Sequence, residues 1–211
     1  MAKPIGTSSD GTCYPFRGTF DGQNHVLSGV SITTDGAAGL FCQLENATMK
    51  NIFFDWSTSV KGETAGVLSA EATGNLTLVN VHSNGSVSAK SIGGGFVGRA
   101  NLTYFYGENC TFDGVLTFEG PILQEPTNGF YFGTMFGYVE TEGNMTLKDC
   151  DLIVQFSHQT LTTSSFYFGG VAGLVHVQDK GLNALSINII RCIATNEFVL
   201  SSANQTVVGG F

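Results

Sequence analysis

The chain has 211 residues, long enough to bury a sizeable core, and with 42% hydrophobic residues its composition excludes a disordered chain. Its formal net charge is −8, and the 9 basic residues form no cluster that could neutralise phosphates, so we expect no nucleic-acid partner. No stretch approaches the ~18 apolar residues of a membrane span, and residues 1–11 lack the apolar region of a signal peptide, so we expect no membrane insertion.

Residues 14–35 form the first recognisable element. They contain "YPFRGTFDGQNHVLSGVSI", in which apolar residues alternate around an Asp and two short turns. This stretch could be the edge of a polysaccharide-cleaving site or the first rung of a scaffold. Asp21 follows Phe20 and precedes Gly22, where a short polar side chain caps backbone groups at a tight turn. We therefore interpret residues 14–35 as an N-terminal rung.

Residues 36–211 carry a repeat. A signature of small and apolar residues recurs as "AGLFC" at 38, "AGVLS" at 65, "GGFVG" at 94, "GTMFG" at 133, "GGVAG" at 169 and "GGF" at 209. Each full signature precedes a polar turn and an alternating stretch such as "GNLTLVNVHS" from 74, and a third alternating stretch follows. Alternation with period two is typical of strands with one buried face. Three short strands with Gly and Asn at the corners describe one coil of a parallel β-solenoid.

Two units are longer, and both place their extra residues before the next signature, at 120–132 and 157–168. Loops that project from one corner lengthen a coil without disturbing its strands. Both insertions end in the same aromatic triplet. These aromatic residues either fill the core or bind a sugar or a protein at the surface, and they are the candidate binding residues Phe130, Tyr131, Phe132, Phe166, Tyr167 and Phe168.

Stacked coils place equivalent residues in columns. The alignment predicts one buried column and one column at a bend, which are Ile52, Val81, Cys110, Cys150 and Cys192, and Asn51, Asn80, Asn109, Asp149 and Arg191. Asn accepts the left-handed conformation of a tight corner, and its amide can bond to the Asn in the next coil.

The cysteine count is odd, which argues against a disulfide framework. Because Cys13 and Cys42 fall in different parts of the coil from the other three, we expect stacked free thiols. A disulfide of Cys150 with Cys110 or Cys192 is conceivable but would be strained between in-register neighbours.

The stretches "PFRGTFDGQNHVLSGVSI" and "AGLFCQLENATMKNIFF", together with "GGFVG", resemble GLUG-type repeats over residues 14–98 and more loosely beyond. The resemblance implies a right-handed parallel β-helix from a large adhesin-like protein that is secreted or on the cell surface. It supplies no catalytic residues, because such repeats accompany separate catalytic or anchoring domains.

The predicted fold is therefore all-β, a single-stranded right-handed parallel β-helix of about six coils in one domain over 1–211. Since the last signature is cut short, we expect a piece of a longer protein. Asn-x-Ser/Thr sequons also favour a secreted protein, although a structural Asn-x-Thr motif could produce several of them. The sequons are at Asn46, Asn75, Asn84, Asn101, Asn109, Asn144 and Asn204.

An enzymatic alternative is a polysaccharide lyase or glycoside hydrolase, since β-helices host both. Glycoside hydrolysis needs two carboxyl groups roughly 5–9.5 Å apart. Asp149 and Asp151 are the best pair, because residues two apart on a strand share a face. The alternative reading is a solvated pair in which Asp149 replaces a ladder Asn, and we favour it.

Other chemistries have less support. The four histidines make no metal-ligand spacing, and we expect no metal and no cofactor. Ice binding is a second alternative, since a β-solenoid can present a rank of threonines. The candidates for that rank are Thr48, Thr77, Thr103 and Thr146. The preferred prediction is a non-catalytic structural or adhesive module that binds a protein or a glycan. An open last coil would allow end-to-end association.

Overall fold

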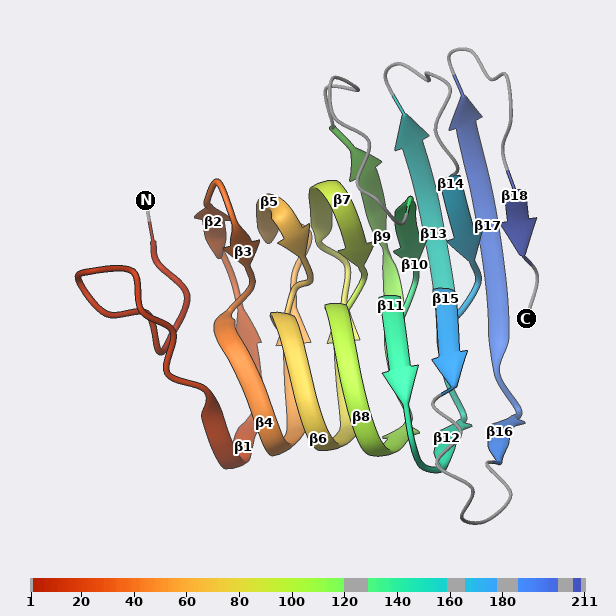
Figure 1. Cartoon of the computed structure of the whole chain (residues 1–211), viewed down its shortest axis with the longest axis horizontal. Helices are drawn as coiled ribbons and strands as arrows, with labels where there is room; N and C mark the ends of the chain where they lie inside the picture. Colours follow the sequence, from red (N-terminus) through yellow and green to blue (C-terminus); the bar gives the residue numbers. More distant parts are fainter. Residues whose placement is uncertain (1, 120–128, 159–165, 178–185, 201–206, 210–211) are drawn as a thin grey trace.

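The computed structural model describes residues 2–119, 129–158, 166–177, 186–200 and 207–209. In these residues there are 18 β-strands in one sheet, every pairing between named strands is parallel, and no helix occurs. The chain winds through six coils that stack along the horizontal axis of Figure 1. The predicted all-β parallel solenoid is thus confirmed.

The coils contain the following strands. The first three coils consist of β1 (Phe16–Leu27), β2 (Ser31–Thr33) and β3 (Ala37–Ala38); β4 (Phe41–Phe54) and β5 (Ser59–Ala65); and β6 (Ser69–Ser83) and β7 (Ser86–Gly94). The last three consist of β8 (Val97–Glu108), β9 (Thr111–Phe118) and β10 (Phe130–Gly133); β11 (Phe136–Thr141), β12 (Met145–Lys148), β13 (Asp151–His158) and β14 (Phe166–Gly169); and β15 (Ala172–Val177), β16 (Ile187–Ile190), β17 (Ile193–Leu200) and β18 (Val207–Gly209).

The recurring signature marks a corner where neighbouring coils approach closely. A Cβ added to Gly95 would lie 2.1 Å from the carbonyl oxygen of Thr134 in the next coil, and one added to Gly66 would lie 2.6 Å from that of Phe96. Real Cβ atoms do not come this close to backbone atoms. The small residues of the signature are therefore required by the spacing of the coils.

The interior is a continuous stack of apolar side chains contributed by alternate residues of each strand. Met49 packs in register with Leu78, and both are fully buried. Aromatic rings also fill the interior, and Phe105 and Phe136 pack edge to face with centroids 4.9 Å apart. Each such side chain contributes roughly 1.5–3 kcal/mol when it is fully buried.

The predicted corner column adopts the left-handed conformation. The φ angles of Asn51, Asn80 and Asn109 are 56°, 55° and 52°, and those of Asp149 and Arg191 are 53° and 50°. The Nδ2 of Asn109 donates to the Oδ1 of Asn80 at 3.1 Å. The prediction of an amide ladder at this bend is confirmed.

Cys13 and Cys42 form a disulfide that was not predicted from the sequence. Residues before β1 double back over the first coils: Ile5 pairs with Phe41, and the amide of Tyr14 donates to the carbonyl of Gly6. This return path brings Cys13 beside Cys42 although the two are 29 residues apart. The other three cysteines are free, as expected.

Candidate functional site

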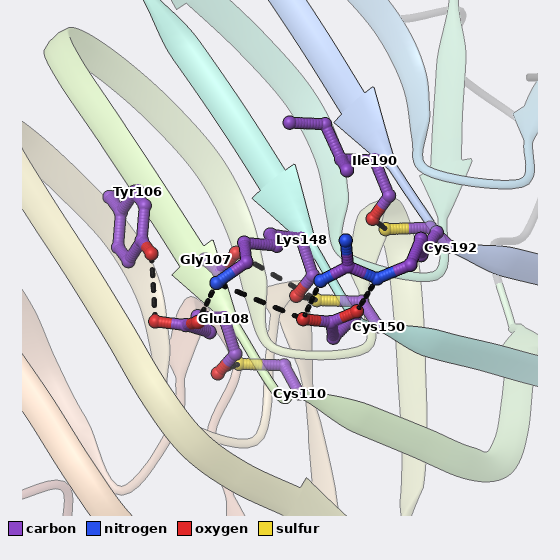
Figure 2. Close-up of polar contacts among 10 residues, drawn as sticks. Tyr106, Gly107, Glu108, Cys110, Lys148, Cys150, Ile190 and Cys192 are labelled. Carbon is purple, nitrogen blue, oxygen red and sulfur yellow. Dashed lines mark hydrogen bonds and ion pairs between the residues drawn. The ribbon is translucent and has the colours of Figure 1, made fainter.

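Charged side chains gather around the corner at the start of β13. The guanidinium of Arg191 donates to both carboxylate oxygens of Asp149, at 2.5 and 2.6 Å. In Figure 2, Lys148 reaches Glu108, which also accepts a hydrogen bond from the hydroxyl of Tyr106 at 2.7 Å. The hydrogen bond from Arg191 holds the pKa of Asp149 below its usual value, and that from Lys148 does the same for Glu108. Both carboxyl groups are therefore ionised at neutral pH.

This geometry does not match the catalytic pair that the sequence suggested. Asp149 lies between β12 and β13 with a positive φ, and only Asp151 belongs to a strand. The argument that residues two apart on a strand share a face therefore fails for this pair. An ionised carboxylate in a bidentate ion pair with Arg191 is also unsuited to donate a proton to a glycosidic oxygen.

Three thiols stack behind this corner, as Figure 2 shows for Cys110, Cys150 and Cys192. The first two are fully buried. A hydrogen bond with Cys110 and burial both raise the pKa of Cys150, so that it remains a neutral thiol. A buried neutral thiol is a poor nucleophile, so Cys150 contributes to the packing of the core.

Of the two roles considered for the aromatic triplets, core filling holds for four of the six residues, and the candidate role of exposed binding residues does not hold for these four. Phe130, Tyr131, Phe132 and Phe168 are at most 6% exposed. Alternate members of the triplet point into the core. There the rings of Phe130 and Phe118 pack with their centroids 4.7 Å apart. Tyr167 is half-buried and stacks on Tyr131 at 5.2 Å. The side chain of Phe166 lies outside the described part.

The aromatic side chain with the greatest exposure in the described residues is Trp56, which is 82% exposed. It lies in the turn between β4 and β5, where the amide of Thr58 donates to the carbonyl of Asp55 at 3.1 Å. The sequence reasoning missed this residue. A signal was present, because the repeat has more residues at this turn in the second coil than in the third.

Two shallow hollows lie on the outer surface. One of about 210 Å³ is lined by residues of β6, β8 and β11, which are Glu71, Ala72, Thr73, Arg99, Asn101 and Glu140. The other, of about 310 Å³, lies over β9, β13 and β17 and is lined by both polar and apolar residues. These three strands run side by side in Figure 1.

Two apolar core positions of β16, in coil six, are more exposed than their counterparts in coil five. Ile187 and Ile189 are 48% and 39% exposed, whereas their partners in coil five, Met145 and Leu147, are 3% and 2% exposed. Residues at core positions are therefore partly in contact with solvent in this strand.

The threonine rank is interrupted. Thr48, Thr77 and Thr146 lie in one outward row, but the row passes through Tyr106. Thr103 falls in a register shift between β6 and β8 and does not belong to the row. The prediction of four consecutive threonines is therefore wrong.

Six of the seven sequon asparagines lie on the described surface and are exposed, and Asn204 lies outside the described residues. Two of them also stabilise the bend before the threonine row. The Oδ1 of Asn46 accepts from the amide of Asn75 at 3.0 Å, and that of Asn144 accepts from the amide of Ser186 at 3.1 Å. Asn101 does not share this column, since it pairs with Thr73 and Glu140.

Within the described residues, no group of three or more His, Cys, Asp or Glu side chains is arranged to hold a metal ion. Nor does that part of the chain contain a helix long and apolar enough to cross a membrane.

The chain is similar to Halomucin of Haloquadratum walsbyi, with 32% identity over 103 residues, which are 47% of this chain and 1% of that protein. This chain thus corresponds to a very small part of its relative's length. No protein-family model matches, so the resemblance to GLUG-type repeats stays a prediction. No solved structure matches the chain.

Proposed function

We propose that the chain is a non-catalytic structural and adhesive module of a larger secreted or cell-surface protein, and that it meets a glycan or a protein through the outer surface of its coils. The observation that carries this proposal is the stacking of the coils in register. All eight residues of β13 pair in register with β9 on one side and with β17 on the other. Such a stack holds outward side chains in fixed rows over many ångströms.

Composition and similarity support the same role. Only 12% of the residues are charged, so that hydroxyls and amides make up much of the polar surface. The relative's name, Halomucin, supports an extracellular setting. In that setting we expect the exposed sequon asparagines other than Asn84, which lines the hollow of about 310 Å³, to carry glycans, and glycopeptide mass spectrometry of the native protein would detect them.

Protease treatment of intact cells of the source organism tests the location. Peptides of this chain should appear in the released fraction while those of a cytosolic marker stay absent. Detection of the chain only after lysis would contradict the proposal.

The non-catalytic role is tested with neutral and acidic polysaccharides as substrates. We expect no new reducing ends and no unsaturated products. Product formation that the variant carrying Asp149→Asn and Asp151→Asn abolishes would establish the enzymatic alternative instead.

We also propose that copies of the chain associate end to end through β16 of coil six. Burial of the exposed core positions Ile187 and Ile189 would favour such association.

A further inference from the structure

Trp56 protrudes because the second coil is longer than the third at one turn. β4 and β6 pair at Phe54 and Ser83, and β5 and β7 pair at Ser59 and Ser86. Between these pairs the second coil has four residues, 55–58, and the third has two, 84–85. The strands keep their register on both sides, so the two extra residues project outward and carry the chain's one Trp into solvent.

The turn is fixed by hydrogen bonds. The Oδ1 of Asp55 accepts from the amide of Ser57 at 2.9 Å and from its hydroxyl at 2.5 Å. The Oγ of Ser57 in turn accepts from the amide of Gly29, in the coil before, at 2.6 Å. A large apolar ring on a turn that is ordered in this way loses little conformational entropy when it binds a ligand.

A stacked pair of aromatic side chains lies close to the turn, on β4 and β6. Phe53 points outward from β4 and stacks on the imidazole of His82 in β6, with centroids 4.7 Å apart and planes 21° apart. Trp56 follows Phe53 by three residues, so their Cα atoms are at most about 11 Å apart. Burial lowers the pKa of His82, which makes this a neutral stacked pair at physiological pH.

The hollow of about 310 Å³ begins beside this turn. Asn84 lines the hollow, and its amide donates to the carbonyl of Phe54 at 3.1 Å, directly before the Trp56 turn. From Asn84 the hollow continues over Asp113 and Gln155. Rings at one end and amide and carboxylate groups beyond them thus follow one another along the same side of the solenoid.

The chemistry of these side chains favours one class of ligand. Aromatic faces pack against the apolar C–H face of a pyranose, while carboxylates and amides accept and donate hydrogen bonds to its hydroxyls. The residues that line the hollow include two carboxylates, Asp113 and Glu197, and no Lys or Arg. Together with the net charge of −8, this disfavours acidic polysaccharides and nucleic acids.

We infer that Trp56, Phe53, His82, Asn84, Asp113 and Gln155 form a binding strip for a neutral oligosaccharide. This inference rests on the proposed adhesive function and names its ligand class. Because Trp56 is the one Trp of the chain, its fluorescence reports on this strip alone.

The test titrates the full chain with four neutral hexasaccharides (maltohexaose, cellohexaose, xylohexaose and mannohexaose) and with oligogalacturonate as the acidic comparison. For at least one neutral probe we expect a blue shift of the Trp emission and at least twofold protection from acrylamide quenching. Isothermal titration calorimetry should show at least a tenfold loss of affinity in Trp56→Ala and a smaller loss in Asp113→Ala. The matched control is Tyr14→Ala, which removes another exposed aromatic side chain outside the strip and should bind as the unmodified chain does.

The inference is overturned if no neutral probe changes the emission, if oligogalacturonate binds more tightly than all of them, or if Trp56→Ala binds like the unmodified chain. Circular dichroism of each variant separates loss of binding from loss of fold. Trp emission that stays unchanged with every neutral probe would instead favour a protein as the partner of the strip. It would not affect the proposed location at the cell surface, which protease treatment of intact cells tests separately.

Discussion

The Nδ2 of Asn80 donates a hydrogen bond to the Oδ1 of Asn51 in the preceding coil, across 2.9 Å. The Oδ1 of the same Asn80 accepts from Asn109 in the following coil. One amide therefore ties three coils together at a corner where the backbone is left-handed.

Asn80→Ala should lower the free energy of unfolding by about 1–3 kcal/mol, because it removes the amide bonds and leaves a Cβ-bearing residue without polar groups at positive φ. Asn80→Gly loses the same bonds but accepts this φ freely, so it should be less destabilised. Urea unfolding followed by circular dichroism measures both. Equal losses in the two variants would show that backbone strain has no part in the effect.

Acid should remove the stabilisation from the Arg191–Asp149 pair. The hydrogen bond from Arg191 holds the pKa of Asp149 in the folded state below its ordinary value. A depressed carboxyl pKa contributes stability above the unfolded value, and this stability is lost as the pH falls from about 4 through the folded pKa. Asp149→Asn keeps a residue that tolerates the left-handed corner but removes the charge. Unfolding measured at neutral pH and at about pH 2 should therefore show a smaller acid-induced loss in this variant. An identical pH dependence would exclude the pair as a source of acid sensitivity.

Removal of the Cys13–Cys42 disulfide by the double substitution to Ala should cost about 2–4 kcal/mol, since the bond closes a loop between residues 29 apart. It should also expose residues 2–15 to limited proteolysis. The matched control is Cys192→Ala, which removes a free thiol and should leave the proteolysis pattern unchanged. Equal protease resistance of the residues before β1 in both variants would contradict a fastening role for the bond.

Ile189→Asp should shift the chain toward a monomer if copies associate through coil six. Ile153 provides a matched control, because it is also 39% exposed but lies on the outer surface of β13. Sedimentation velocity over a range of concentrations should show association in the unmodified chain and in Ile153→Asp. Association that persists in Ile189→Asp would place the contact elsewhere.

The interrupted threonine row predicts an absence of thermal hysteresis. Tyr106 stands between Thr77 and Thr146 and breaks the flat rank that ice binding would use. Nanolitre osmometry on the full chain checks this. A measurable difference between the melting and freezing temperatures would restore the ice-binding alternative.

The features that the sequence revealed are those that repeat with the coil. The column of Asn51, Asn80 and Asn109 was visible because each coil must turn at the same place, and few residues tolerate that turn. The fold followed from the same periodicity. Burial of Cys110 and Cys150 was likewise predictable, because both alternate with polar residues.

Features outside the repeat were not predictable in this way. Cys13 belongs to a segment that returns over the coils without sharing their period. Thr103 was misplaced because the fourth coil shifts register by one residue, which pattern alignment does not detect. The aromatic triplets pack against other aromatic rings in the core. Their composition alone did not distinguish core packing from an exposed binding surface.

The two extra residues at the Trp56 turn leave the pairings at Phe54 and Ser59 intact. Length at this corner is therefore decoupled from the folding of the solenoid. Evolution can lengthen, exchange or delete such a turn one coil at a time, and duplication of a coil would copy the turn together with its support. A surface of this kind can change its specificity by small insertions while the scaffold that carries them stays the same.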